Sequence, residues 1–248
     1  MSGGEVSIPR PERGGSEPND GVSTARSLCL FDLDDTLLPI DSDHAWGEFV
    51  TQLGWVDAAE FARRNDAFYA QYKAGQLDIH EYIAFATEPL RVRSAAETAA
   101  AHRRFMAEVI APNLHPAALE LVSDHRRRGD LIALVTATND FITAPIARAF
   151  GIDTLIAVRL ERGPSGTITG RINGTPSYRE GKVQRVAQWL SEGGADWGGF
   201  DRISVYSDSV NDLALLERAT DPVATNPSPA LEAIALERGW RVLRLFKT

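Results

Sequence analysis

The sequence lacks an excess of basic residues, and this bears on the partners that it can bind. Its 26 Lys and Arg residues are outnumbered by 34 Asp and Glu residues, so the formal net charge at pH 7 is −8. No run of basic residues offers a stripe of positive charge for a phosphate backbone. We therefore expect no nucleic-acid partner.

Cysteine and long apolar runs are also scarce. Cys29 is the only cysteine and has no partner for a disulfide, which is typical of a reducing compartment. No stretch reaches the roughly 18 uninterrupted apolar residues that a membrane helix needs. The first 26 residues also lack the apolar segment of a secretory signal. We expect a cytoplasmic protein with no membrane partner.

The composition favours one folded core with a smaller inserted subdomain. A chain of 248 residues, 44% of them apolar, can bury one ordinary α/β core and still have residues left for an insertion. Residues 1–26 are rich in Gly, Pro, Ser and charge, and they can bury too little apolar surface to offset the entropy of ordering. We predict that they form a disordered tail.

Short apolar runs alternate with helical patterns along most of the chain, as in a sheet whose strands are joined by helices. The fold class that this order predicts is α/β, with a doubly wound parallel sheet. Ligands of such sheets bind beyond the carboxyl ends of the strands. Strands are predicted at 27–31, 130–136, 203–206 and 220–225, and helices at 116–128, 141–150, 180–192 and 212–218.

Two segments depart from this alternation. Residues 43–111 carry four helical patterns separated by turn or capping residues, which predicts a helical cap inserted into a core formed by residues 27–42 and 112–248. Residues 155–172 contain two β-like runs around the turn residues Arg-Gly-Pro-Ser-Gly, which predicts a hairpin.

Acidic residues follow the first predicted strand. Asp32, Asp34 and Asp35 stand within four residues, followed by Thr36, and three carboxylates so close together repel one another unless a cation or a capping role relieves them. An acidic turn or a helix N-cap is the plainer interpretation of such residues. Because this cluster follows a buried strand, we expect a positive group beside it.

Further candidates follow the later strands. Asp208 and Asp212 come just after the run 203–206, and their hard oxygen atoms suit Mg²⁺, although Asp208 could instead cap a helix. Thr136 ends a predicted strand, where its hydroxyl could donate to a phosphate oxygen or serve only a turn. Lys182 stands at the start of a helix, whose N-terminus is already partly positive, so an anion nearby would relieve it.

Four short motifs, taken in order, resemble those of the haloacid dehalogenase superfamily: FDLDDT, LVTATN, the Gly181–Lys182 pair and SDSVND. The match runs from residue 27 to about residue 231. The long helical insertion after the first motif, the glycine before the lysine and the form of the fourth motif resemble the subclass that contains phosphoserine phosphatase. Some members of that subclass are labelled histidinol-phosphatases.

This resemblance implies hydrolysis of a small phosphomonoester through an aspartyl-phosphate. Asp32 would be the nucleophile, because its carboxylate can split one difficult displacement into two easier ones. Asp34 would be the general acid and base, which requires a pKa lifted toward neutrality.

The resemblance also implies a Mg²⁺ cofactor. The side chains of Asp32 and Asp208 and the backbone carbonyl of Asp34 would bind the ion, and Asp212 would support it or its waters.

The resemblance also implies which side chains bind the phosphoryl group of the substrate. Thr136 and Lys182 would hold the phosphoryl oxygens and stabilise the charge that spreads over them in the transition state.

The sequence departs from phosphoserine phosphatases after the first motif. Those enzymes have a glutamate there that holds the substrate ammonium, whereas this chain has Asp41 and Asp43. Either aspartate could pair with an ammonium or imidazolium, and histidinol phosphate carries both kinds of group. Capping of the first helix of the insertion is an equal alternative for these two residues.

Three other functions are compatible with parts of this pattern. A receiver domain uses similar residues, but in another order and in a shorter chain. A phosphotransferase or phosphomutase of the same fold differs only in its acceptor, which the sequence does not reveal. A binding protein with a degenerate site would lack some of the residues that are all present here.

Overall fold

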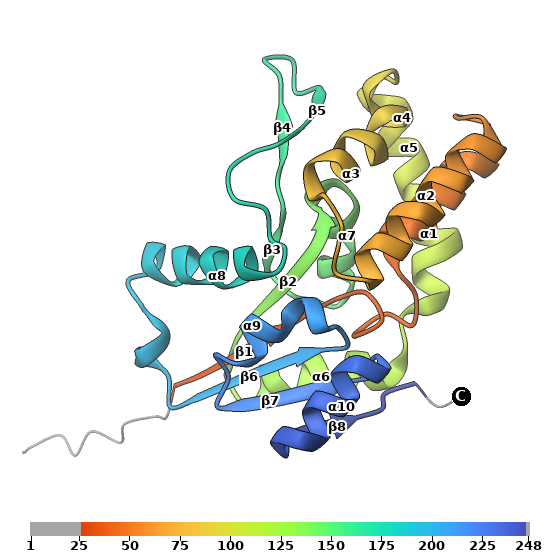
Figure 1. Ribbon diagram of the computed structural model, residues 1–248. Coiled ribbons are helices and arrows are strands. Elements are labelled where there is room, and N and C mark those ends of the chain that lie inside the picture. The colour runs from red at the N-terminus through yellow and green to blue at the C-terminus, as the bar shows by residue number, and fades with distance from the viewer. Residues whose placement is uncertain (1–25, 247–248) are drawn as a thin grey trace, which may run out of the picture.

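The structure, a computed structural model, describes residues 26–246 and is built around a six-stranded parallel sheet (Figure 1). The order of its strands is β3-β2-β1-β6-β7-β8. The predicted tail falls almost entirely on residues 1–25, outside the described range. The strands are β1 (Ser27–Phe31), β2 (Leu131–Asn139), β3 (Thr154–Val158), β6 (Arg202–Ser207), β7 (Asp221–Thr225) and β8 (Arg241–Leu243).

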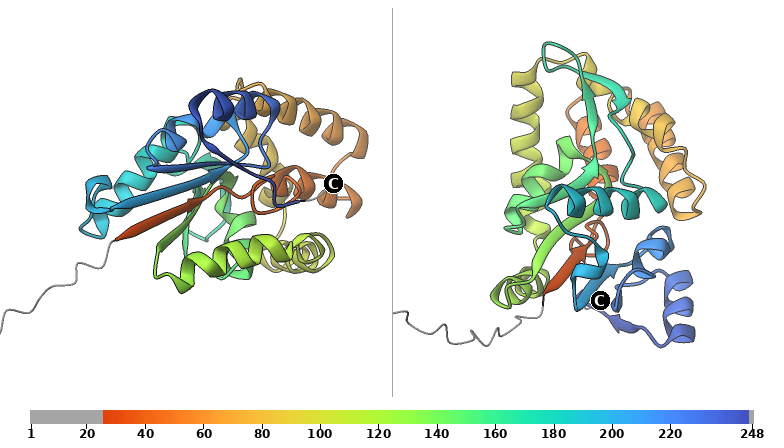
Figure 2. Two further views of the ribbon diagram at one scale, coloured as in Figure 1. Left: turned by 90° about the horizontal axis from the view of Figure 1, so that it is seen from below. Right: turned by 90° about the vertical axis from the view of Figure 1, so that its left-hand side faces the viewer.

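Helices cover both faces of this sheet, so the predicted doubly wound α/β fold is confirmed (Figure 2). Strand β1 shows why: Leu28 and Leu30 point into one apolar cluster, and Cys29 and Phe31 into another. One face packs against α6 (Pro116–Arg127) and α7 (Asp140–Ala149). The other face packs against α8 (Glu180–Glu192), α9 (Leu213–Leu216) and α10 (Pro229–Arg238).

Residues 42–110, which we call the helical insertion, contain only helices and lie at one end of the sheet (Figure 1). Capping side chains begin four of them: Asp41, Asp57, Asp78 and Ser94 each accept a hydrogen bond from a first-turn N–H. The helices are α1 (Ser42–Gln52), α2 (Ala58–Lys73), α3 (Ile79–Ala86), α4 (Glu88–Arg91) and α5 (Ala95–Phe105), followed by the π-helical turn Met106–Ile110 and the 3₁₀ turn Ala111–Asn113.

The predicted hairpin at 155–172 is partly wrong. Its first run forms β3, the edge strand of the main sheet, because Leu155 packs on one apolar cluster and Ile156 on the other, as in a strand covered on both faces. The hairpin itself is shorter and consists of β4 (Leu160–Arg162) and β5 (Ile168–Ile172). It stands beside α3, where Leu160 and Ile83 share a third apolar cluster (Figure 2).

Other elements differ from the sequence prediction in extent. Strand β2 continues through Asn139, three residues beyond the predicted end. The helix predicted at 212–218 is the 3₁₀ turn Val210–Asp212 followed by the short α9. Helix α10 and strand β8 were not predicted. Within residues 26–246, none of the helices is long and apolar enough to cross a membrane.

Candidate active site

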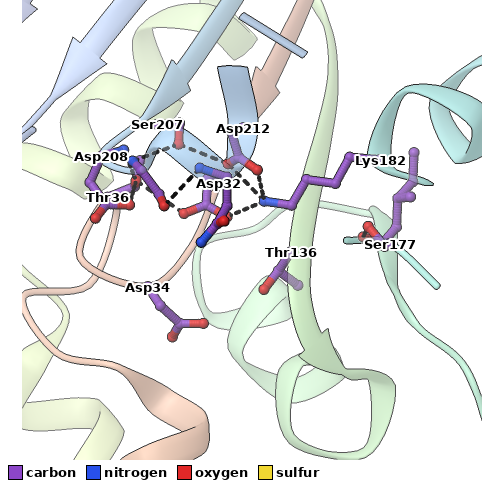
Figure 3. Close-up of polar contacts among 12 residues, drawn as sticks. Asp32, Asp34, Thr36, Thr136, Ser177, Lys182, Ser207, Asp208 and Asp212 are labelled. Atoms are coloured by element: carbon purple, nitrogen blue, oxygen red, sulfur yellow. Dashed lines mark hydrogen bonds and ion pairs between the residues drawn. The ribbon is translucent and has the colours of Figure 1, made fainter. Parts of the chain in front are cut away.

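The candidate site lies where the carboxyl ends of three neighbouring strands meet. Strand β1 pairs with β2 on one side and with β6 on the other. Asp32 follows β1, Thr136 lies in β2 and Asp208 follows β6, while Lys182 reaches in from α8 (Figure 3). The parallel topology therefore brings together side chains that are far apart in the sequence.

Asp32 is held on three sides. Its backbone N–H donates to the carbonyl of Tyr206 in β6 at 2.9 Å. Its Oδ1 lies 2.7 Å from the Nζ of Lys182, and its Oδ2 accepts from the hydroxyl of Thr36 at 3.1 Å. Burial raises the pKa of Asp32 to about 7, and the positive charge of Lys182 opposes this rise.

Lys182 is a buried cation between two carboxylates. Its side chain is 1% exposed, and Nζ lies 2.7 Å from Asp32 and 2.7 Å from Asp212 (Figure 3). Burial lowers the pKa of Lys182, but the charges of Asp212 and Asp32 outweigh it and leave the pKa above its usual value. The lysine is therefore protonated, and it neutralises part of the acidic cluster.

Asp34 is fixed by two donors that the sequence analysis missed. Its Oδ1 accepts from the backbone N–H of Ser42 at 2.7 Å, and its Oδ2 accepts from the hydroxyl of Thr138 at 2.8 Å. Burial and then the charge of Asp41 raise the pKa of Asp34 to about 7. Asp34 can therefore hold or release a proton near neutral pH. Thr138 could have been found from the strand period of two, since it follows Thr136 by two residues.

Thr36 joins the two carboxylates that were predicted to bind metal. Its Oγ1 lies 3.1 Å from Oδ2 of Asp32 and 3.3 Å from Oδ1 of Asp208, and it accepts from the backbone N–H of Asp208 at 3.0 Å. Burial, followed by the charges of Asp32 and Asp35, raises the pKa of Asp208 well above its usual value. One hydroxyl hydrogen cannot serve two carboxylates at once, so the pair is short of positive charge.

Asp212 contacts the lysine and a serine. It is 1% exposed, and its Oδ2 accepts from the hydroxyl of Ser207 at 2.7 Å as well as from Lys182. Its predicted support of a metal stays a prediction. Ser207 is another site residue that the sequence analysis missed, although it stands at the start of the SDSVND motif.

The donor set fits Mg²⁺. Within residues 26–246, no group of three or more His, Cys, Asp or Glu side chains is arranged to hold a metal ion. The predicted site needs only two carboxylates, those of Asp32 and Asp208, with a backbone carbonyl, and Mg²⁺ commonly binds one or two carboxylates plus waters and phosphate oxygens. The excess of buried carboxylates over the one ammonium of Lys182 is the physical reason to expect a cation here.

One cavity contains three of the predicted site residues and both aspartates that follow the first motif. Asp32, Asp34 and Thr136 line it together with Asp41 and Asp43. The hydroxyl oxygen of Thr136 accepts from the N–H of Thr138 at 3.1 Å, which leaves its hydrogen available to an anion in the cavity. The cavity thus joins the candidate phosphate site to the helical insertion.

Asp41 and Asp43 have different environments. Asp41 caps α1, since its Oδ1 accepts from the N–H groups of Asp43 and His44 at 3.0 and 2.8 Å. Asp43 is 6% exposed, and its Oδ1 is buried without a hydrogen-bond partner. Burial and then the charge of Asp34 raise the pKa of Asp43 to about 7, and a side-chain hydrogen bond with Tyr82 opposes this rise. The capping alternative is therefore confirmed for Asp41 only.

Comparisons with known proteins give the family to which the chain is similar. Residues 29–217 match a family model described as haloacid dehalogenase-like hydrolase. The histidinol-phosphatase of Neisseria meningitidis serogroup C (strain 8013) is 44% identical over 218 residues, which are 88% of this chain and 98% of that protein.

Two solved structures share the fold. A protein of unknown function from Bordetella pertussis Tohama I has a TM-score of 0.85 and 52% identity, covering 90% of this chain and 100% of that one. A substrate-bound phosphoserine phosphatase has a TM-score of 0.63 and 18% identity, covering 88% of this chain and 92% of that one.

Proposed function

Because this chain belongs to the haloacid dehalogenase-like hydrolase family and is a phosphoric monoester hydrolase, as its motifs predicted, we propose that it cleaves a small phosphomonoester through an aspartyl-phosphate on Asp32 with the help of Mg²⁺. One observation carries the proposal. Asp32, held 2.7 Å from the buried ammonium of Lys182, lines the same cavity as Asp34, whose pKa is raised to about 7. The proposed nucleophile, Asp32, and the proposed proton donor, Asp34, therefore line the same cavity.

The first step transfers the phosphoryl group to the enzyme. A carboxylate oxygen of Asp32 forms a bond to phosphorus while the bond from phosphorus to the alcohol oxygen breaks. Asp34 gives its proton to the leaving oxygen, so the alcohol departs neutral. The raised pKa of Asp34 supports this role, since a carboxyl of ordinary pKa would hold no proton at pH 7.

The second step returns the enzyme to its starting state. Asp34, now ionised, takes a proton from a water that attacks the phosphorus of the aspartyl-phosphate, and the bond to Asp32 breaks to release inorganic phosphate. Thr138 and Ser42 hold the Asp34 carboxylate in place through both steps.

Positive charge at the phosphoryl oxygens would come from side chains and from the metal. The ammonium of Lys182 and the hydroxyl of Thr136 would bind these oxygens and stabilise their charge in the transition state. Mg²⁺, held by the side chains of Asp32 and Asp208 and the backbone carbonyl of Asp34 with Asp212 in support, would screen the repulsion between nucleophile and phosphate.

The helical insertion would act as a cap over this site. Its residues Phe68 and Tyr82 line the same cavity as Asp32, and the side-chain amide of Asn211 donates to the backbone carbonyl of Tyr72 at 2.9 Å. The domain division is then a core of residues 27–42 and 112–248 and a cap of residues 43–111. Such a cap would exclude water during phosphoryl transfer.

The substrate would carry an amine or imidazole group, as in histidinol phosphate or phosphoserine. The histidinol-phosphatase relative supports this class, and so does the buried carboxyl group of Asp43 in the cavity. Asp41 would contribute its negative charge while it caps α1. A cytoplasmic location and the lack of nucleic-acid and membrane partners stay predictions.

The test is phosphate release from a panel of phosphomonoesters, with Mg²⁺ and with a chelator, by the wild-type enzyme and by Asp32→Asn. We expect release that depends on Mg²⁺ and a kcat at least about a thousandfold lower in the variant. Substrate loss without phosphate release would indicate the phosphotransferase alternative. Near-normal turnover by Asp32→Asn would contradict the nucleophile, and no turnover of any compound would favour a non-catalytic relative. Family membership leaves the receiver-domain alternative without support.

A further inference from the structure

One side of the reactive cavity is formed by α2 of the helical insertion. Asn65, Phe68, Tyr69 and Tyr72 line the cavity, and their spacing in the sequence places them on one face of this helix. Tyr72 is the last of the four and lies in the last turn of α2, which ends at Lys73. The hydroxyl of Tyr72 is therefore a polar group that the insertion brings to the cavity.

The phenol of Tyr72 lies among the carboxylates of the site. Tyr72 shares the cavity lining with Asp32 and Thr136. Burial, and then the charges of Asp32 and Asp212, raise the pKa of Tyr72 well above its usual value. The phenol therefore keeps its proton at neutral pH and acts as a hydrogen-bond donor in this cavity.

Two side chains of the core hold the last turn of α2 in place. The amide of Asn211 donates to the backbone carbonyl of Tyr72 at 2.9 Å, and the guanidinium of Arg179 donates to the carbonyl of Gly75 at 3.2 Å. The last carbonyls of a helix lack partners within the helix and carry partial negative charge, so an amide and a cation suit this place. This end of α2 lies beside the core (Figure 1), and the core therefore positions Tyr72.

The two side chains that hold α2 come from the segments that also carry site residues. Asn211 precedes Asp212 in the 3₁₀ turn Val210–Asp212, and Arg179 directly precedes α8, which carries Lys182. The segments that bring Lys182 and Asp212 together therefore also fix the place of Tyr72.

We propose that Tyr72 is a catalytic residue whose hydroxyl donates a hydrogen bond to a phosphoryl oxygen, and that Asn211 and Arg179 position it. The proposal rests on the proposed phosphatase function and adds a donor from the insertion to those of Lys182 and Thr136 from the core. No bond to Tyr72 forms or breaks, and its hydroxyl keeps its proton through both steps. Because every phosphomonoester brings the same oxygens, this contribution does not depend on the organic group.

Tyr72→Phe tests the donor, because it keeps the ring and removes only the hydroxyl. We expect kcat to be at least about tenfold lower, by a similar factor on p-nitrophenyl phosphate, phosphoethanolamine and histidinol phosphate, since a preorganised donor acts most strongly on the charge of the transition state. An unchanged kcat would overturn the proposal. A loss confined to one substrate would assign the hydroxyl to the organic group and would overturn it as well.

Tyr178→Phe is the matched control. The ring of Tyr178 lies 6.2 Å from the ring of Tyr72, but Tyr178 does not line the cavity. Loss of its hydroxyl should change kcat by less than about twofold. Equal losses in Tyr178→Phe and Tyr72→Phe would contradict a specific role for the Tyr72 hydroxyl.

Inhibition by orthovanadate separates a contact with the phosphoryl oxygens from a purely structural role. Vanadate presents oxyanion oxygens and has no organic group, so its inhibition constant should rise at least about tenfold in Tyr72→Phe. The urea midpoint of unfolding should stay that of the wild type. An unchanged inhibition constant with a lower midpoint would show that the hydroxyl only supports the fold, contrary to the proposal.

A double-mutant cycle tests the positioning by the core. Asn211→Ala should lower kcat at least about tenfold in the wild type but less than about threefold in Tyr72→Phe, which has no hydroxyl left to misplace. Arg179→Ala should follow the same pattern. Equal factors in both backgrounds would overturn the positioning.

The same assays separate this inference from the proposed function. An active wild type with normal turnover by Tyr72→Phe would defeat this inference alone. A wild type that releases phosphate from none of the substrates would defeat the proposed function as well.

Discussion

At the scale of single residues, Lys182 has a demanding environment, since its charged side chain is 1% exposed. It is a fully buried ammonium whose only compensation is the pair of carboxylates of Asp32 and Asp212. Its removal leaves both carboxylates buried without a counter-charge, and breaking a buried ion pair in this way costs about 3–5 kcal/mol. The residue therefore has a structural role beside its proposed role at the phosphate.

Lys182→Met is accordingly expected to lower the free energy of unfolding by about 3–5 kcal/mol at pH 8, because a methionine fills the space without the charge. Urea denaturation measures this loss. The exposed Lys73→Met should stay within about 0.5 kcal/mol of the wild type. A Lys182→Met protein as stable as the wild type would mean that Asp32 and Asp212 are not charged in the folded state.

Asp43 affects stability in the opposite direction to Lys182, because its charged form destabilises the folded state. Its pKa is raised from 3.8 to about 7 by burial and by Asp34, so the folded state binds a proton more tightly than the unfolded state. A raised pKa contributes stability that is full below about pH 4 and is lost as the pH rises through about 7. The ionised carboxylate thus destabilises the fold on the alkaline side.

Asp43→Asn should therefore become more stable relative to the wild type as the pH rises. The difference in free energy of unfolding between variant and wild type should grow by a few kcal/mol between pH 4 and pH 8, and it should level off above that. Urea denaturation at a series of pH values provides the measurement, and Asp57→Asn is the matched control. A difference that does not vary with pH would show that Asp43 has an ordinary pKa.

The sequence predicted the charged residues of the site better than the hydroxyl groups that position them. Asp32, Asp208 and Lys182 stand out because acidic and basic groups next to buried strands and helix starts need an explanation. Thr36, Thr138 and Ser207 are individually ordinary, and only the packed structure reveals that their hydroxyls donate to the carboxylates of the site. The separate environments of Asp41 and Asp43 also depend on packing that one sequence does not encode in a readable pattern.

At the scale of elements, the position of the first turn of α8 determines the position of Lys182. Gly181 lies so close to the preceding loop that an added Cβ would clash with the backbone carbonyl oxygen of Pro176. Arg179, two residues earlier, has a positive φ of 51°. A residue other than glycine adopts this backbone conformation at a cost in free energy. The loop and the first turn of α8 are therefore tightly fitted, and the lysine depends on that fit.

Gly181→Ala should displace the start of α8, because a backbone carbonyl cannot move aside as a flexible side chain would. We expect a loss of about 1–3 kcal/mol in unfolding free energy and at least a tenfold lower kcat, since Lys182 moves with the helix. Gly193→Ala, at the other end of α8, is the matched control, because its Cβ would lie 3.4 Å from the nearest atom. Equal effects of the two substitutions would contradict a specific role for Gly181.

Local sequence patterns predicted most of the helices and strands. They failed where tertiary contacts determine whether a segment forms a strand and with which strand it pairs. Helix α8 has the predicted bounds because its apolar stripe is regular over its whole length. The run that became β3 looked like half of a hairpin, since a short apolar run does not reveal whether it pairs with its sequence neighbour or with β2. Strand β8 has only three residues, too few for a period to appear.

At the scale of the whole molecule, the net charge of the chain and the charge of the acidic site have the same sign. The protein carries a formal charge of −8, and its most concentrated buried acidity lies at the ends of β1 and β6. A bound cation would relieve repulsion among Asp32, Asp208 and Asp212 in the folded state, whereas the unfolded chain has no such site. Binding to the folded state alone raises stability with ligand concentration.

Mg²⁺ should therefore raise the melting temperature of the wild-type protein, by an amount that corresponds to about 2.7 kcal/mol when its concentration is a hundred times the Kd. Asp208→Asn removes one of the two proposed side-chain ligands, so the same rise should need more Mg²⁺, and activity should return in part at high concentration. Asp124→Asn removes the same charge from the solvent-facing side of α6, where Asp124 pairs with Arg127, and it separates the site from a general effect of net charge. If all three proteins respond alike to Mg²⁺, the ion acts by screening rather than at the carboxylates of Asp32 and Asp208, and the proposed metal site is wrong.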